Sequence, residues 1–252
     1  RMATMQDFEN FAKLACSSDI IDITGGLLVE PTDIVTDLRP LEITQSLIRN
    51  SDKPFLGSVA GTAGAQESIE MARIVMDDIS QKPCMVGLIN INSPLCLSPP
   101  MADAMVEYVK AGQPILLTPG ILLGMTAPVT IVGALMQAFA ELIGCVVTTR
   151  VLSPSTPVII GLGGVASDLR NATTGFGRPE HAIAIQLGAK IARHLNLPFR
   201  CTAAVTGALP LDLGKHLVTL GLEVVQVLPD AGLGLGVAAG VGAGSEAVPR
   251  EL

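Results

Sequence analysis

Two hydrophobic periodicities alternate along the chain. Short apolar runs of the kind that form buried strands are each followed by a stretch in which apolar residues recur every three or four positions, as on one face of a helix. The strand-like runs cover residues 19–26, 53–61, 84–93, 114–120, 156–164 and 197–205, and they precede helix-like stretches at 38–50, 65–79, 101–112, 124–144, 178–196 and 210–222. A further strand-like run begins at Glu223. The pattern predicts six strand–helix units and a seventh strand.

Repeated strand–helix units of this spacing favour a parallel sheet, and so long a run without an internal linker favours an α/β fold closed into a TIM-type (β/α) barrel. The barrel is expected to be incomplete, because an eight-unit barrel needs another unit beyond residue 230. We therefore divide the chain into a barrel domain, residues 1–231, and a tail rich in Gly, Ala and Val, residues 232–252. An open, doubly wound sheet is the alternative.

Composition restricts the class of protein. Of the 252 residues, 49% are hydrophobic and 15% are charged, so the chain can bury a large core. A formal net charge of −7 without a dense run of Lys or Arg argues against nucleic acid as a partner. The apolar stretches are broken before they reach a bilayer-spanning length, which predicts a soluble chain without membrane contact. Five cysteines without C-x-x-C spacing favour reduced thiols, a cytoplasmic location and no metal site.

Candidate site residues follow from the expected barrel. In a parallel barrel, the residues that face a ligand lie at the carboxyl ends of the strands and in the loops after them. The polar or aromatic candidates at these places are Asn90, Ser93, Thr126, Asp168, Arg170, Phe176 and Thr206. The loop after the fifth strand, residues 161–180, is the longest of these loops, and long loops of this kind are usually functional. The strand ends offer no obvious acid–base pair, so no catalytic residue is assigned.

The segment Gly-Met-Thr-Ala-Pro at 124–128 connects the fourth strand to its helix. Thr126 is a candidate N-cap and Pro128 suits the first turn, so the helix is predicted to begin at the barrel mouth. The glycine lets the backbone approach a ligand, and the free N–H groups of the helix start would hold an anionic group. An ordinary capped helix is the alternative. Gln137 and Glu141 lie roughly 15–20 Å further along, which favours a packing or interface role for them.

Several motifs accompany this segment: "GLININSPL" before it, and "PSTPVIIG", "DLRNATTGFGRPEHA" and "LNLPFRC" after it. In this order they resemble the trimethylamine:corrinoid methyltransferase family, and the resemblance runs from about Asp7 to about Asp212. It implies a TIM barrel that passes a methyl group from a methylated amine to the cobalt of a corrinoid protein. Family chains are longer at both ends, which agrees with an incomplete barrel. Members that act on trimethylamine carry pyrrolysine near the positions matching 205–208, and this sequence has none there.

A member without pyrrolysine is similar to enzymes that demethylate quaternary amines such as glycine betaine. The resemblance implies a methylated amine in the barrel mouth, with its cationic nitrogen near Asp168 and Phe176. Asn90 and Ser93 would orient it, and Arg170 or the N–H groups of the segment 124–128 would hold a betaine carboxylate. A surface ion pair between Asp168 and Arg170 is the alternative. No cofactor is expected to bind directly, because the cobalt corrinoid (cobamide) is carried by a partner protein. An inactive fragment or a non-catalytic binding barrel of the same fold is the alternative, and a homo-oligomer is left open.

Overall fold

A computed structural model describes residues 2–19, 21–26, 28–76, 78–80, 82–163, 165–169, 173–174, 178–202, 222–226 and 237–239. Its helices are α1 (Met5–Ser17), α2 (Arg39–Asn50), α3 (Gly61–Val75), α4 (Pro99–Lys110), α5 (Ile131–Leu152) and α6 (Pro179–His194). Its strands are β1 (Ile21–Thr24), β2 (Phe55–Gly57), β3 (Met85–Ile91), β4 (Ile115–Pro119), β5 (Val158–Leu162), β6 (Ser167–Asp168), β7 (Thr173–Thr174), β8 (Phe199–Thr202), β9 (Leu222–Gln226) and β10 (Val237–Ala239).

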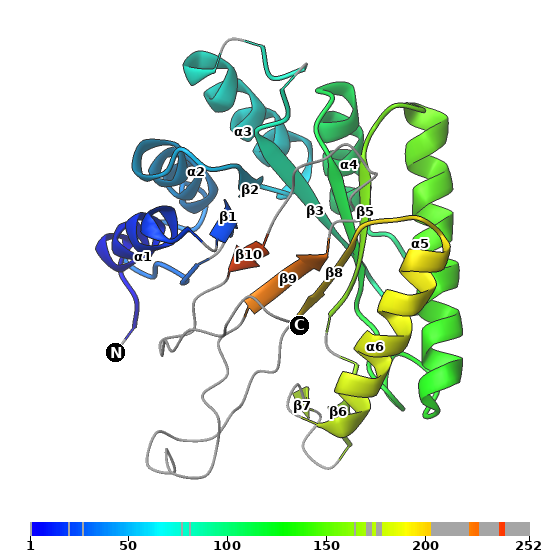
Figure 1. The fold of residues 1–252 in the computed structure, drawn as a ribbon. Coiled ribbons are helices and arrows are strands. Elements are labelled where there is room, and N and C mark those ends of the chain that lie inside the picture. The colour runs from blue at the N-terminus through cyan, green and yellow to red at the C-terminus, as the bar shows by residue number, and fades with distance from the viewer. Residues whose placement is uncertain are drawn as a thin grey trace.

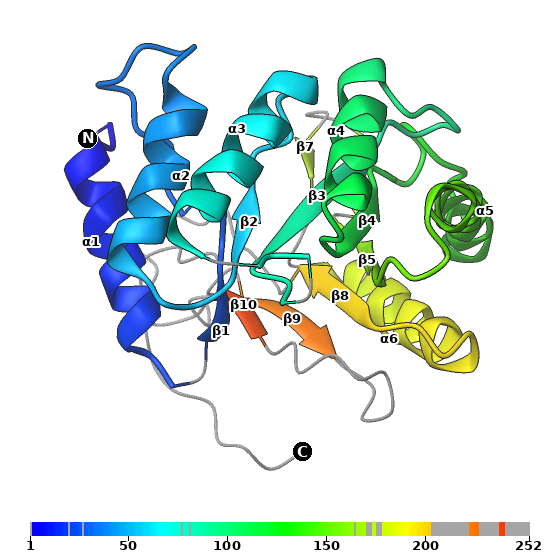
Figure 2. The ribbon, with the colours of Figure 1, turned by 90° about the horizontal axis from the view of Figure 1, so that it is seen from above.

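Six strands, β1, β2, β3, β4, β5 and β8, run parallel and curl into a half-barrel. The helices lie outside these strands in the order in which they follow them along the chain (Figures 1 and 2). This is the predicted α/β fold, and it is consistent with an incomplete TIM barrel. The predicted strand–helix pairs from 19–26 to 178–196 are confirmed, as is the sixth strand. The helix predicted at 210–222 lies outside the described residues, apart from Leu222, which begins β9.

The seventh strand differs from the prediction. A strand is present at this place and begins at Leu222, but β9 pairs antiparallel with β8, so that Phe199 faces Gln226. β10, which lies in the predicted tail, pairs antiparallel with β9 and parallel with β1 and thereby closes the ring of strands. Because β9 runs in the opposite direction, its carboxyl end lies at the other rim from those of the six parallel strands. The repeating parallel pattern therefore ends at β8.

The parallel strands are buried on both faces, as the high apolar content predicts. In β4, Ile115 and Leu117 face the large core between sheet and helices, while Leu116 packs inside the barrel with Ile23 and Ile159. One layer of the interior therefore consists of aliphatic side chains. Polar residues such as Ser58, Asn90 and Thr118 lie beyond this layer toward the carboxyl ends, and we call the rim at these ends the mouth.

A single aromatic ring fixes α4 against the sheet. Tyr108 is fully buried, and a Cβ atom at Gly57 would lie 2.2 Å from its hydroxyl oxygen. A Cβ atom at Gly87 would lie 2.6 Å from the ring, so the two glycines make room for the tyrosine. The hydroxyl donates a 2.6 Å hydrogen bond to the carbonyl of Ser58, and burial raises the pKa of Tyr108. This contact holds the end of β2, where the mouth begins.

Among the described residues, one helix is long and apolar enough to cross a membrane by length and composition. This is α5, with a mean hydropathy of 1.8 over its most apolar window, of which 39% is buried. Core helices of proteins that never meet a membrane pass the same test.

Candidate functional site

A cavity of about 440 Å³ opens at the mouth, where the carboxyl ends of β1, β2 and β3 meet the start of α2. Most of its wall is apolar. The lining residues are Gly26, Thr36, Arg39, Pro40, Ile43, Thr44, Leu56, Gly57, Ser58, Val59, Leu88 and Asn90. A carboxamide and a guanidinium thus face a volume suited to a small molecule.

Asn90 is the predicted site residue that lines this cavity. It lies on the inward side of β3, opposite Thr118 of β4, because the side chains of β3 alternate between the barrel interior and the helices. Its side chain is exposed and makes no hydrogen bond with the part of the chain that the structure describes. The carboxamide can therefore donate to or accept from a ligand.

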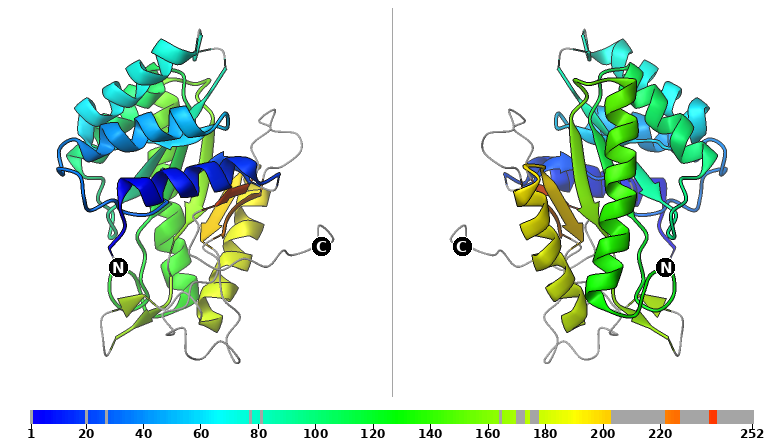
Figure 3. Two further views of the ribbon diagram at one scale, coloured as in Figure 1. Left: turned by 90° about the vertical axis from the view of Figure 1, so that its left-hand side faces the viewer. Right: turned by 90° about the vertical axis from the view of Figure 1, so that its right-hand side faces the viewer.

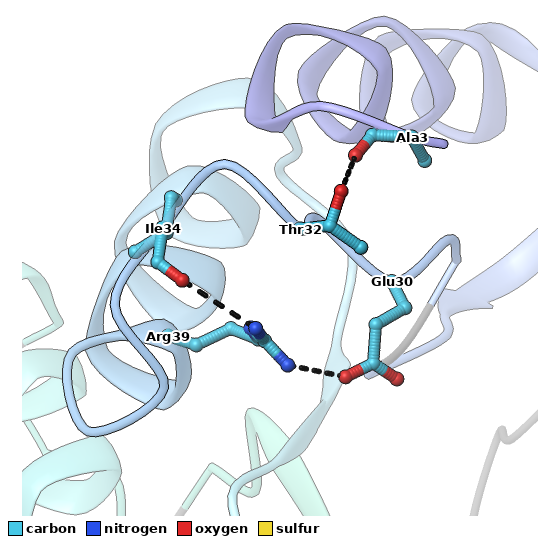
Figure 4. Close-up of polar contacts among 5 residues, drawn as sticks. All are labelled: Ala3, Glu30, Thr32, Ile34 and Arg39. Carbon is cyan, nitrogen blue, oxygen red and sulfur yellow. Dashed lines mark hydrogen bonds and ion pairs between the residues drawn. The ribbon is translucent and has the colours of Figure 1, made fainter. Parts of the chain in front are cut away.

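Arg39, the first residue of α2, supplies the positive charge of the cavity. Its Nη1 lies 2.5 Å from Glu30 Oε1, and its Nη2 donates to the carbonyl of Ile34 at 3.4 Å (Figure 4). These contacts use two of the five N–H groups of a guanidinium. The Nε atom is buried without a hydrogen-bond partner. The same loop is tied to the segment before α1, because Thr32 donates its hydroxyl to the carbonyl of Ala3.

The loops after β3 and β4 are joined by a second group of polar residues. Glu141 of α5 is 5% exposed and accepts hydrogen bonds from Ser93 Oγ at 2.6 Å and from the backbone N–H of Leu95 at 2.9 Å. Gln137 donates from Nε2 to Glu141 at 2.9 Å and to the carbonyl of Thr126 at 2.9 Å. The packing role predicted for Gln137 and Glu141 agrees with these contacts. The hydroxyl of Ser93, which we predicted to contact the substrate, is the donor in this hydrogen bond to Glu141.

The prediction that Thr126 caps α5 is wrong. The helix begins at Ile131, and its N-cap is Thr130, whose hydroxyl accepts from the N–H of Gly133 at 3.2 Å. The Thr126 hydroxyl closes the preceding turn instead: it accepts from the N–H of Leu122 at 2.8 Å and donates to the carbonyl of Gly120 at 2.7 Å. Both threonines are followed by apolar residues, and only the additional turn at 122–127 decides between them.

The long loop after β5 lies beside this turn. Ser167 donates its hydroxyl to the carbonyl of Leu123, and the N–H of Leu123 donates to Val165 at 2.9 Å. Asp168 forms an ion pair of 3.0 Å with Arg178. Asn90 lies near the carboxyl end of β3, and Ser93, Thr126 and Asp168 lie after the carboxyl ends of β3, β4 and β5. Arg170, Phe176 and Thr206 lie outside the described residues.

Sequence reasoning missed two polar residues of the barrel interior. Arg200 of β8 is 5% exposed and lies opposite Gly161, on the side of the strand away from the helices. Burial lowers its pKa to about 10. Thr118 is also buried, and its hydroxyl has no hydrogen-bond partner among the described residues. The signal was present, because a charged residue stands at an alternate position within the apolar strand "LPFRC".

No group of three or more His, Cys, Asp or Glu side chains that could hold a metal occurs within the described residues. The thiol of Cys145 lies on α5, and burial, followed by the negative charge of Glu141, raises its pKa. Such a thiol is a poor nucleophile and a poor metal ligand at neutral pH. The chemistry of the described mouth thus rests on charge and hydrogen bonding.

A family model described as trimethylamine methyltransferase (MTTB) matches residues 1–215. The chain belongs to this family. It is 36% identical over 215 residues to the glycine betaine methyltransferase of Desulfitobacterium hafniense (strain Y51), covering 84% of this chain and 45% of that protein. It is 27% identical over 244 residues to the proline betaine:corrinoid methyltransferase of Eubacterium limosum, covering 93% of this chain and 49% of that protein. The chain therefore spans just under half the length of these relatives.

A second protein of Eubacterium limosum, the L-carnitine:corrinoid methyltransferase, is 25% identical over 216 residues, covering 82% of this chain and 44% of that protein. These relatives confirm the resemblance seen in the motifs. Among solved structures, an alcohol dehydrogenase of Thermococcus sibiricus has a TM-score of 0.32 at 13% identity, covering 82% of this chain and 94% of that one. That value is too low to bear on the fold or the function.

Proposed function

We propose that this chain forms the substrate-binding mouth of a methyltransferase that moves a methyl group from a carboxylated quaternary amine to the cobalt of a corrinoid protein. The observation that carries the proposal is the cavity over β1, β2 and β3. It combines aliphatic walls, from residues such as Leu56 and Leu88, with the guanidinium of Arg39. The aliphatic walls can pack against methyl groups, and the guanidinium can bind a carboxylate. Named relatives act on glycine betaine and proline betaine, both of which carry a carboxylate.

The methyl transfer requires little proton transfer by the protein. The cobalt electron pair attacks the methyl carbon while the carbon–nitrogen pair leaves with nitrogen, so a quaternary ammonium departs as a neutral amine. No general acid is required. The protein has to align the carbon–nitrogen bond with the cobalt and to exclude water. An open mouth over which a cytoplasmic corrinoid protein docks transiently meets this requirement.

The sequence-predicted residues take different parts in this proposal. Asn90 orients the ligand from the cavity wall. Ser93 and Thr126 hold the adjoining loops, since their hydroxyls are used within the protein. A cation near Asp168 would share the carboxylate with Arg178. The roles of Arg170, Phe176 and Thr206 stay predictions.

The decisive assay uses free cob(I)alamin in place of the corrinoid protein and follows methylcobalamin formation. The panel is glycine betaine, proline betaine, L-carnitine, trimethylamine and choline, and calorimetry measures the binding of each to the same protein. We expect the carboxylated amines to bind and to react ahead of choline, which has the same cation and no carboxylate. Binding without turnover would support the non-catalytic barrel. Absence of both with every amine would refute the proposal.

Arg39→Gln tests the carboxylate contact. We expect the affinity for glycine betaine to fall roughly 10- to 100-fold, as for a lost charged hydrogen bond, with the weak binding of choline unchanged. Arg49→Gln is the matched control, because it removes the same charge from the exposed far end of the same helix. Equal losses for both ligands would place the carboxylate elsewhere.

Glu30→Gln tests the same contact with the opposite sign. Glu30 is the carboxylate that Arg39 binds in the structure, so a ligand carboxylate competes with it. We expect the variant to bind glycine betaine more tightly than the wild type. Weaker binding would show that the ion pair positions Arg39 and does not compete with the ligand.

A further inference from the structure

α5 carries an apolar stripe on the face turned away from the barrel. Five large aliphatic side chains along it are between 48% and 79% exposed: Val132, Met136, Ile143, Val147 and Val151. Ala140 is exposed in the middle of the row. With these spacings the six residues fall within one third of the helix circumference. We call them the α5 stripe.

The opposite side of α5 is an ordinary core face. Leu135, Ala138 and Leu142 are buried in the main core, and the helix packs on β4 and β5. The α5 stripe therefore faces away from the barrel. The right-hand view of Figure 3 shows α5, in green, along the outside of the structure. At about 1.5 Å per residue, the helix is about 33 Å long. Exposed apolar rows of this length on monomeric proteins usually mark an interface.

Charge is nearly absent from this surface. Every residue of α5 is described, and the charged member of its exposed set is Arg150, near the end, whose Nη1 donates to the carbonyl of Pro154 in the same chain. A partner of opposite charge is thus not indicated. An apolar helix of a partner would fit this surface.

The positions of the α5 stripe are symmetric about the middle of the helix. The midpoint of the helix lies between Glu141 and Leu142. Val132 and Val151 are equidistant from it, and so are Met136 and Val147, and Ala140 and Ile143. If two copies of α5 pack antiparallel about a two-fold axis at this midpoint, every member of the stripe meets another member.

The centre of the stripe allows such an approach. Gly144 is exposed beside Ala140, and a Cβ atom added to it would meet nothing within 4 Å. Small residues where two helices cross let the backbones come close, while the larger side chains on either side interlock. Five aliphatic side chains and the loop residue Val129, 71% exposed, offer on the order of 500–800 Å² per copy. A standard dimer interface buries about 800 Å² per partner.

From these observations we infer that the α5 stripe is a self-association surface, on which a second copy of this chain packs through its own α5, antiparallel. The inference does not depend on the proposed function. A lipid bilayer is a poorer occupant, because crossing it would require α5 to leave the sheet and to take the buried Glu141 with it. A helix that lies on a barrel and presents a symmetric apolar row fits a two-fold dimer.

The test is a charge exchange across the two-fold axis, with the molar mass measured by sedimentation equilibrium. The wild type is expected at twice the chain mass of 26.1 kDa. Met136→Glu and Val147→Lys are each expected to halve that mass. The double variant, with both changes in every chain, is expected to restore the dimer, because the carboxylate introduced into one copy then meets the ammonium introduced into the other at two equivalent places. The two positions are too far apart on one helix to pair within a chain.

Ile74→Glu is the matched control, since Ile74 is 83% exposed on α3, which packs against α2 and α4. It should leave the dimer intact, and circular dichroism should show that all variants keep their helix content. A monomeric wild type would overturn the inference, as would a double variant that stays monomeric. A protein that floats with liposomes of neutral phosphatidylcholine would overturn it in favour of a membrane.

Discussion

Over β3 and β4, the loops of the mouth are tied to α5 by hydrogen bonds, whereas the carboxyl ends of β1, β2 and β3 surround an open cavity. On the first side Ser93, Gln137 and Glu141 use their polar atoms within the protein. On the second side Asn90 makes no such bond with the described residues, and Arg39 keeps N–H groups that its ion pair does not use. Asn90 and Ser93, near the end of β3 and in the loop after it, thus differ: the Ser93 hydroxyl is bound within the protein, whereas the Asn90 side chain is open to a ligand.

The largest effect on stability is expected from the removal of Glu141, which joins the loops of the mouth to α5. Glu141→Ala leaves Ser93 Oγ, the N–H of Leu95 and Gln137 Nε2 without their common acceptor. We expect the free energy of unfolding to fall by about 3 kcal/mol, because hydrogen bonds to a buried charged group are lost together. Glu141→Gln keeps an acceptor and should lose less than half as much. Urea unfolding followed by circular dichroism measures both.

The control for that experiment is Glu70→Ala. Glu70 pairs with Arg73 on the exposed face of α3, and both side chains are largely in water. Its removal should change the free energy of unfolding by less than about 0.5 kcal/mol. A loss equal to that of Glu141→Ala would mean that the hydrogen bonds around α5 carry no special weight.

Much of this difference between the two sides of the mouth could not be predicted from the sequence. The periodicities placed β1 to β5, β8 and the helices between them, because a period of two or of 3.6 reports directly which residues face a core. The bounds of α5 were wrong, since the helix spans Ile131–Leu152 and was predicted at 124–144. They also placed Asn90 at a strand end. They could not connect Glu141 with Ser93, because distance along a helix says nothing about which loop descends over it.

Other errors have equally specific causes. Thr126 and Thr130 both satisfy the rules for an N-cap, and the choice depends on a turn closed by side-chain hydrogen bonds. The antiparallel direction of β9 was missed because strand periodicity carries no information on direction. Arg39 was passed over as part of an amphipathic helix, although its position at the first turn places it at the mouth.

The cavity side depends on packing behind it, and Gly57→Ala tests this. A Cβ atom there would overlap the hydroxyl of Tyr108, which holds the carbonyl of Ser58. We expect a loss of about 2 kcal/mol in the free energy of unfolding from overpacking. Gly163→Ala is the matched control, because its Cβ would lie 3.6 Å from Thr118 Cγ2, an ordinary contact, and it should change the free energy of unfolding by less than about 0.5 kcal/mol. Equal effects of the two substitutions would show that the ring of Tyr108 moves aside freely.

The smallest expected effect on stability is at Asn90, where a change in ligand binding can be separated from a change in stability. Asn90→Ala removes an exposed side chain without hydrogen bonds to the described residues, so the free energy of unfolding should change by less than about 0.5 kcal/mol. The same change should weaken glycine betaine binding roughly 2- to 10-fold, the worth of one neutral hydrogen bond. Asn90→Asp separates orientation from charge: a carboxylate at this position repels the carboxylate of glycine betaine and attracts the cation of choline. We therefore expect calorimetry to show the preference for glycine betaine over choline reduced or reversed in Asn90→Asp, while its unfolding curve in urea stays within error of the wild type. An unchanged preference would place the ligand away from Asn90, and a large loss of stability would place Asn90 among the residues that hold the barrel together.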